Sequence, residues 1–194
     1  MWDNRYREHG WVSEPDSLVV EIAGSLVPGT ALDLGGGTGR HSLWLAVAGW
    51  TVTCVDISGV GLAQAKDRAA QEGVSITCVT SSIHDFVPSG AGYDLVLLAN
   101  IHPPSEERPR LIADAARAVG PRGRLLVLGH DISALGHAGP SDPDRLFTEE
   151  ELSRLMTGTG LQMERAEVVN RHIGDTGDAG DAVVVALAVR SSAG

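Results

Sequence analysis

The sequence lacks the features that mark membrane-spanning, secreted and nucleic-acid-binding proteins. No apolar run approaches the roughly 20 residues that a transmembrane helix needs. No N-terminal segment combines a basic start, an apolar middle and a small-residue cleavage site. The net charge is −10, and the 15 basic residues form no dense cluster. Because such a chain attracts neither nucleic acid nor an anionic membrane, we expect a cytoplasmic protein that binds neither.

Cysteine is also scarce. The two cysteines, Cys54 and Cys78, each lie in an apolar run that is typical of a strand. Two isolated cysteines form no disulfide framework, so we expect buried thiols in a reducing compartment. The sequence contains no His-x-His, His-x3-His or Cys-x2-Cys spacing, and it therefore predicts no metal site.

The length and composition fit one globular domain. The 194 residues are enough for a single domain over 1–194, and the hydrophobic fraction of 43% is ordinary. Residues 1–15 are different, because two of the four tryptophans and Tyr6 lie there. This segment is too aromatic for a disordered tail, and we expect either a packing arm or a lid over a ligand.

Strand-like and helix-like segments alternate along the chain. The strands are predicted at 30–34, 51–57, 75–80, 93–100 and 124–131, and the helices at 16–26, 39–49, 59–72, 105–119 and 148–156. Two more strand-like runs, 161–173 and 181–190, flank the turn "GDTGDAGD", whose aspartates we expect in solvent. The pattern predicts a Rossmann-like, doubly wound α/β fold. Its seven-stranded sheet is mostly parallel, is buried on both faces and ends in an antiparallel hairpin.

Four glycines occupy the five positions 35–39, between the first of these strands and the next helix. Glycines at such a turn usually let a ligand approach the backbone. A P-loop is excluded because no lysine follows, and a dinucleotide motif would need a glycine where Arg40 stands. Asp33, just before the glycines, suits a ligand ammonium group better than a pyrophosphate, because two negative charges repel.

These features resemble the class I S-adenosylmethionine-dependent methyltransferases. "DLGGGTG" fits the first motif of that family, acidic-x-Gly-x-Gly-x-Gly, and "VDIS" places Asp56 at the family's ribose-binding acid. "YDLVLLAN", which ends at Asn100, fits the fourth motif. "WDNRYREHGW" is similar to the N-terminal segment of the small tellurite-resistance and thiopurine methyltransferase-like branch. The resemblance covers 30–131 and implies an enzyme that uses S-adenosylmethionine to methylate a small molecule.

The resemblance also implies which residues contact the cofactor. In place of the acid that often binds the adenine amino group, this sequence has Ser82, followed by Ile83. Aromatic side chains of the N-terminal segment are expected to shield the sulfonium, because aromatic faces attract cations. The expected cofactor-binding residues are Tyr6, Trp11, Asp33, Gly35, Gly37, Gly39, Arg40, Asp56, Ile57, Ser82, Ile83 and Asn100.

His102, in "NIHPP" after the fourth strand, lies where the family binds the methyl acceptor. We expect its neutral imidazole to act as a general base where the acceptor must lose a proton; the alternative is a simple turn residue. His130 and Asp131, at the end of the fifth strand, are the next candidates. The long loop 132–147, which contains His137, is typical of a lid or a binding loop.

Three functions stay open at this point. The first is methyl transfer from S-adenosylmethionine to an oxygen, nitrogen, sulfur or metalloid nucleophile of a small molecule. The second is a nicotinamide-dependent oxidoreductase, against which Arg40 argues. The third is a non-catalytic module that binds S-adenosylmethionine. The sequence leaves the methyl acceptor open, and it is compatible with both a monomer and a homodimer.

Overall fold

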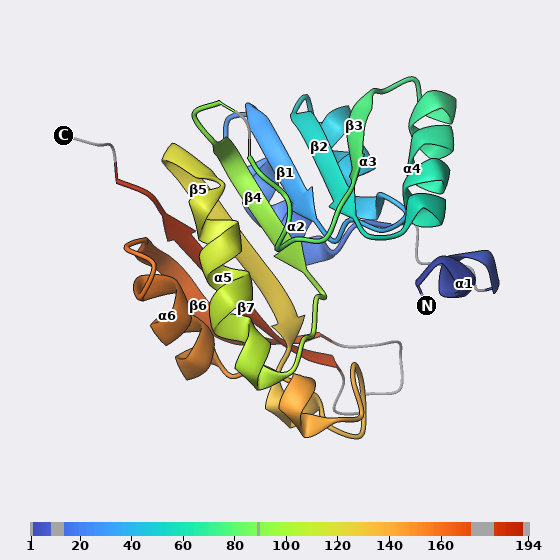
Figure 1. Cartoon of the computed structure of the whole chain (residues 1–194). Coiled ribbons are helices and arrows are strands. Elements are labelled where there is room, and N and C mark those ends of the chain that lie inside the picture. Colours follow the sequence, from blue (N-terminus) through green and yellow to red (C-terminus); the bar gives the residue numbers. More distant parts are fainter. Residues whose placement is uncertain (1, 9–13, 89, 172–180, 192–194) are drawn as a thin grey trace.

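The computed structural model describes residues 2–8, 14–88, 90–171 and 181–191. Its sheet has seven strands in the order β3-β2-β1-β4-β5-β7-β6 (Figure 1). Strands β1 to β5 run parallel, β7 is antiparallel to β5, and β6 is antiparallel to β7. The predicted doubly wound sheet with its C-terminal hairpin is thus confirmed. The strands are β1 (Thr30–Leu34), β2 (Thr51–Asp56), β3 (Ile76–Thr80), β4 (Tyr93–Ala99), β5 (Val119–His130), β6 (Gln162–Arg171) and β7 (Asp181–Val189).

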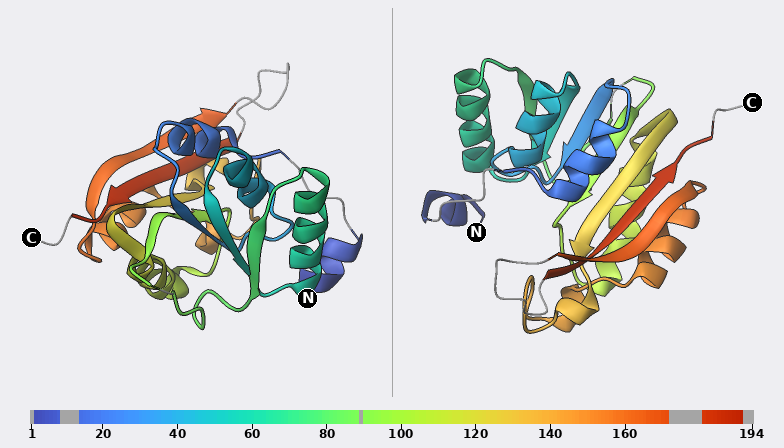
Figure 2. Two further views of the ribbon diagram at one scale, coloured as in Figure 1. Left: turned by 90° about the horizontal axis from the view of Figure 1, so that it is seen from above. Right: turned by 180° about the vertical axis from the view of Figure 1, so that it is seen from behind.

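Helices cover both faces of this sheet. Helices α5 and α6 lie on the face that is in front in Figure 1, whereas α2 and α3 lie on the opposite face, seen in the right-hand view of Figure 2. Helix α4 packs against β2 and the edge strand β3. The helices are α1 (Trp2–Glu8), α2 (Ser17–Gly24), α3 (Arg40–Val47), α4 (Gly59–Gln71), α5 (Arg108–Arg117) and α6 (Glu149–Thr157).

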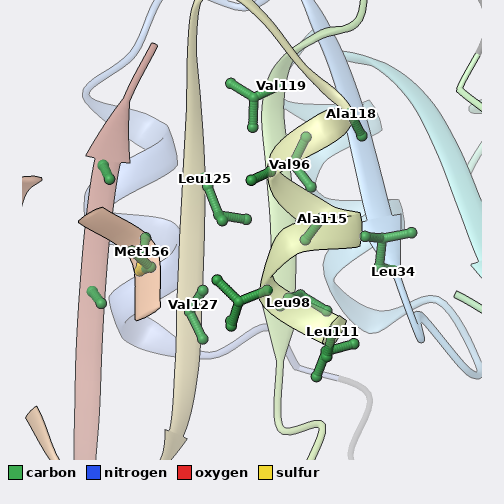
Figure 3. Close-up of a cluster of buried hydrophobic side chains, with 14 of the residues drawn as sticks. Leu34, Val96, Leu98, Leu111, Ala115, Ala118, Val119, Leu125, Val127 and Met156 are labelled. Carbon is green, nitrogen blue, oxygen red and sulfur yellow. The ribbon is translucent and has the colours of Figure 1, made fainter. Parts of the chain in front are cut away.

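Two apolar cores follow from this arrangement. Figure 3 shows the larger one, where side chains of β4 and β5 such as Leu98 and Val127 meet Leu111 and Ala115 of α5 and Met156 of α6. The other core joins α2 and α3 to the reverse face of the same strands. Because the central strands are buried on both sides, the parallel sheet holds the ends of its strands in fixed positions.

Several local predictions were wrong. Strand β3 is an edge strand and is only partly buried, not covered on both faces. The helix expected at 105–119 is a short 3-10 turn, Ser105–Glu107, followed by α5. The strand expected from residue 124 already pairs at Val119, because an irregularity lets 120–123 bulge between two paired segments. The N-terminal segment contains the short helix α1, which the periodicity did not reveal.

The capping chemistry of α6 agrees with the sequence. The side chain of Thr148 accepts a hydrogen bond from the Glu151 backbone N–H at 3.1 Å, and a Thr followed by a Glu three residues later has the spacing of a capping box. In the part of the chain that the structure describes, no helix combines the length and the apolar character needed to traverse a bilayer.

Candidate functional site

The glycine loop 35–39 lies at the carboxyl end of β1, where the strand order reverses between β1 and β4. Gly35, Gly37 and Gly39 have φ values of 74°, 54° and 81°, a region that side-chain-bearing residues rarely adopt. A Cβ on Gly35 would collide with the side chain of Ile101. The loop therefore needs glycine both for its backbone conformation and for the close approach of neighbouring groups.

Two buried carboxylates, those of Asp33 in β1 and Asp56 in β2, lie next to this loop. The Ser42 hydroxyl donates to Asp33 at 2.7 Å, and burial raises the pKa of Asp33 to about 6. Asp56, at the end of β2, accepts hydrogen bonds from the backbone N–H groups of Gly37 at 2.9 Å and Ser58 at 2.8 Å. Burial raises the pKa of Asp56 as well. Asp56 thus ties the glycine loop to the start of α4.

Helix α1 lies beside the end of α4 (Figure 1), and its Tyr6 side chain reaches the glycine loop. Asp3 accepts hydrogen bonds from the Ser58 hydroxyl and from the Val60 N–H, and the Gln64 side chain donates to the Tyr6 carbonyl at 3.0 Å. The Tyr6 hydroxyl lies where a Cβ on Gly37 would be, and its ring packs on Gly61. Burial raises the pKa of the Tyr6 phenol, so it stays protonated at neutral pH.

A second group of polar side chains gathers at the carboxyl ends of β4 and β5. The His130 backbone N–H donates to Nε2 of His102 at 3.1 Å, so Nε2 is an acceptor and the His102 proton lies on Nδ1. Burial, together with the smaller effect of the neighbouring His130, lowers the pKa of His102 to about 4. The His130 Nδ1 lies 3.1 Å from His102 Nε2, and its Nε2 lies 3.2 Å from an Asp181 oxygen.

Comparison with known proteins identifies the domain that carries this geometry. Residues 31–123 match the family model of a methyltransferase domain. The structure is similar to TehB from Haemophilus influenzae, with a TM-score of 0.74, 19% identity, and coverage of 98% of this chain and 67% of that one. It is also similar to magnesium protoporphyrin IX methyltransferase (ChlM) from Synechocystis with bound S-adenosylhomocysteine. There the TM-score is 0.71, the identity 24%, and the coverage 97% and 92%.

Residues 31–123 of this chain thus match a methyltransferase domain, and the chain has the same fold as TehB and ChlM. Among curated proteins, ribosomal RNA small subunit methyltransferase C of Alcanivorax borkumensis is 29% identical over 133 residues, covering 63% of this chain and 39% of that protein. The chain spans about two fifths of the length of the curated relatives that it matches. The methyltransferase match disfavours the nicotinamide alternative, as Arg40 in the glycine motif already suggested.

The residues of this site fit S-adenosylmethionine, the cofactor that the sequence analysis predicts, in three respects. The loop offers a backbone surface without Cβ atoms, and Asp56 places a carboxylate at the end of β2. Asn100 has a φ of 60° directly after β4. Its Nδ2 is buried and has no hydrogen-bond partner among the described residues. Because an unsatisfied buried donor costs about 1–3 kcal/mol, this amide is suited to bind a ligand acceptor.

The contacts of the other predicted cofactor-binding residues do not by themselves indicate a ligand. Arg40 begins α3, and Ile57 follows Asp56 with its side chain exposed. The Ser82 hydroxyl donates to Asp85 and accepts from its N–H, so it is engaged in a local turn, while Ile83 packs near Gly35. Trp11 lies outside the described residues. The cofactor roles of all these residues stay predictions.

Asp181 is a site residue that the sequence analysis missed. The expectation that the aspartates of "GDTGDAGD" lie in solvent is wrong for Asp181, which is buried and faces His130. The antiparallel register pairs His130 of β5 with Val183 of β7, which brings the start of β7 to the end of β5. The sequence feature that could have predicted this site residue is an acid immediately before an apolar hairpin strand.

The structure also places two other candidates of the sequence analysis. Asp131 accepts a hydrogen bond from the Ser133 N–H at the start of a 3-10 turn, and His137 is exposed.

The loop 132–147 is anchored near these histidines. Arg108, which is buried, donates to the Glu151 carboxylate and to the Asp144 carbonyl, and its guanidinium lies 4.6 Å from the centre of the Phe147 ring. Arg145 donates to the His102 carbonyl at 2.9 Å. A pocket of about 330 Å³ beside Arg108 and Glu151 contains none of the predicted cofactor residues.

Proposed function

We propose that this chain transfers the methyl group of S-adenosylmethionine to a nucleophilic atom of a small molecule. The observation that carries the proposal is the meeting of three features at one end of the sheet: the glycine loop, Asp56 and the unsatisfied amide of Asn100. The bound cofactor supplies an activated methyl group, which is the difficult part of the chemistry. The protein then has to hold, align and desolvate the two reactants, and good alignment supplies roughly 7–11 kcal/mol.

On the cofactor side, each group has a role that follows from its contacts. The Asp56 carboxylate, already fixed by two backbone N–H groups, is placed to accept hydrogen bonds from the ribose hydroxyls. Tyr6 closes the loop from the side of α1 and excludes water there. We propose that residues 1–15 act as a lid over the cofactor. This lid is part of a single domain that spans 1–194.

On the acceptor side, His102 remains our candidate general base. It is neutral at pH 7, so it adds no second positive charge beside a sulfonium. Its Nε2 lone pair is occupied by the His130 N–H, so an acceptor proton would have to displace that hydrogen bond. A thiolate-like acceptor needs no such base. Neutral Asn100 is suited to orient the acceptor or the cofactor.

A small molecule is the favoured acceptor because the chain is acidic. The chain is acidic, and we assign it no nucleic-acid or membrane partner. ChlM, whose fold it shares, acts on magnesium protoporphyrin IX, whereas the curated relative from Alcanivorax acts on ribosomal RNA. We also propose that the protein is cytoplasmic and is a monomer or a homodimer.

The test combines cofactor binding with methyl transfer. S-adenosylhomocysteine is titrated calorimetrically into the wild type and the Asp56→Ala variant. We expect Asp56→Ala to weaken binding by roughly 1.5–3 kcal/mol, because a charge-assisted hydrogen bond is lost. Asp94→Ala is the matched control, because Asp94 lies in β4 and its carboxylate binds Thr30 at the opposite end of the sheet. Equal affinities of Asp56→Ala and the wild type would remove Asp56 from the site.

Methyl transfer is then sought by mass spectrometry with cofactor that carries a deuterated methyl group. The acceptor panels are phenols, thiols, amines and metalloid oxyanions, with a structured ribosomal RNA fragment as the competing substrate. A labelled small-molecule product supports the proposal. Labelling of the RNA alone would overturn the small-molecule assignment. Binding of S-adenosylhomocysteine without any product would favour the non-catalytic module.

A further inference from the structure

The two cysteines of the chain face each other on neighbouring strands. Cys54 in β2 and Cys78 in β3 are register partners in a parallel pair, so their side chains lie on the same side of the sheet. Adjacent strands are about 4.8 Å apart, within the roughly 4.4–6.8 Å between Cα atoms that a disulfide spans. The two thiols are close enough to share a hydrogen bond, although both cysteines are reduced.

The two thiols differ in access and in acidity. Cys54 is buried, as predicted, but Cys78 lies on the edge strand and is only partly covered, so the expectation of two buried thiols was wrong for Cys78. The hydrogen bond from Cys54 lowers the pKa of Cys78 to about 7, and Lys66 adds to this effect. The same hydrogen bond and burial raise the pKa of Cys54. Cys78 is therefore the thiolate that solvent reaches, and Cys54 is the protonated partner behind it.

Cys54 also touches the cofactor loop. A Cβ on Gly36 would lie 2.5 Å from the Cys54 sulfur and 2.9 Å from an Asp33 oxygen, so this sulfur supports the loop from below. Ser42, which donates to Asp33, also hydrogen bonds with Cys54. Any movement of the Cys54 sulfur toward β3 removes the support beneath Gly36.

We propose that Cys54 and Cys78 form a peroxide-responsive thiol pair whose oxidation to a disulfide weakens cofactor binding. The oxidant is a hydroperoxide. The Cys78 thiolate attacks its terminal oxygen, the O–O bond breaks, and the departing oxygen takes up a proton, which leaves Cys78 as a sulfenic acid. The Cys54 sulfur, losing its proton, then attacks the Cys78 sulfur. The S–S bond forms, and hydroxide leaves and combines with that proton as water. Two electrons pass from the thiols to the peroxide.

The link to the cofactor site follows from distance. A disulfide brings the two sulfurs to about 2.05 Å, so we expect the Cys54 sulfur to move toward Cys78 and away from its position under Gly36. We expect the dissociation constant of S-adenosylhomocysteine to rise at least tenfold on oxidation. Because coupling between two sites is reciprocal, bound S-adenosylhomocysteine should disfavour the disulfide to the same extent. The inference concerns cofactor binding and goes beyond the proposed methyl transfer.

The experiment measures the disulfide and the affinity separately. The purified chain is treated with hydrogen peroxide, unfolded, alkylated with N-ethylmaleimide and digested with trypsin. Lys66 and Arg68 lie between the two cysteines, so a disulfide appears as two linked peptides that dithiothreitol separates. We expect linked peptides in the wild type. Cys54→Ser should instead give a Cys78 sulfenic acid that dimedone traps, and Cys78→Ser should leave Cys54 unmodified.

Calorimetry with S-adenosylhomocysteine on the reduced, oxidised and re-reduced protein gives the second reading. A tenfold loss that dithiothreitol reverses, and that is absent from Cys78→Ser, supports the proposal. Linked peptides with unchanged affinity would overturn the coupling to the cofactor loop. Disulfides between chains, or irreversible sulfinic acid without linked peptides, would overturn the thiol pair itself. None of these readings depends on a methyl acceptor, so the methyl-transfer proposal stands or fails on its own.

Discussion

The two halves of the candidate site are built in different ways. The cofactor half centres on β1, the glycine loop and β2, with Tyr6 of α1 and Asn100 after β4 added to it, and backbone N–H groups and glycines make most of its contacts. The acceptor half, at β4, β5 and β7, joins His102, His130 and Asp181 through side chains that lie far apart in the sequence. The first half depends on backbone shape, and the second depends on long-range side-chain pairing. Substitutions should therefore affect the two halves through different properties.

Gly37→Ala is expected to damage the cofactor half most. The new Cβ would meet the Tyr6 hydroxyl, and the residue must hold a φ of 54°. We expect S-adenosylhomocysteine binding to fall more than about 100-fold, equivalent to roughly 2.7 kcal/mol or more. Gly73→Ala is the matched control, because it has a φ of 70° with nothing within 4 Å of its Cβ. It should lose about 1 kcal/mol of stability and keep its affinity. Retained binding by Gly37→Ala would mean that the loop adapts without its glycine.

The acceptor half should show a pH dependence of stability whose sign is opposite to that of the cofactor half. The folded-state pKa of His102 is about 4, below the unfolded value of about 6.5. The unfolded state therefore binds more protons between these values, and stability is lost as the pH falls from about 6.5 toward 4. Between pH 7 and 5 the wild type should lose about 2 kcal/mol relative to His102→Gln, measured by urea denaturation.

The comparison with His102→Gln cancels the contributions of other groups. Asp33 titrates in the same range with the opposite sign, because burial raises its folded-state pKa to about 6. A difference between the two proteins that stays constant from pH 7 to 5 would contradict a buried neutral His102. In that case the imidazole would be solvated in the folded protein.

Tyr6→Ala is expected to have the smallest effect. It removes the cover from Gly37 while Asp3 still anchors α1 to the start of α4. We expect about a tenfold weaker S-adenosylhomocysteine affinity, near 1.4 kcal/mol, with an unchanged far-ultraviolet dichroism spectrum. Arg7→Ala, an exposed change one residue further along α1, is the control. If both variants bind as the wild type does, α1 is structural packing and not a lid.

The accuracy of the sequence analysis differed between the two halves for a physical reason. The positions of the strands and the glycine loop were predictable, because apolar periodicity and positive-φ glycines are local properties of the chain. Asp181 was not, because its burial depends on the register between β5 and β7, which no local pattern reports. The exposure of Cys78 and the extension of β5 to Val119 were missed for the same reason, since both depend on which strand lies next to them.

The position of β7 has a consequence for the order in which the protein assembles. Strand β7 follows β6 in the chain but lies between β5 and β6 in the sheet, so β6 reaches the sheet only through β7. During synthesis the ribosome releases the whole glycine-loop half well before it releases β7. The glycine loop 35–39 can thus form before β7 is available, whereas Asp181 meets His130 only when β7 pairs with β5. Completion of the acceptor half therefore has to wait until β7 has joined the sheet.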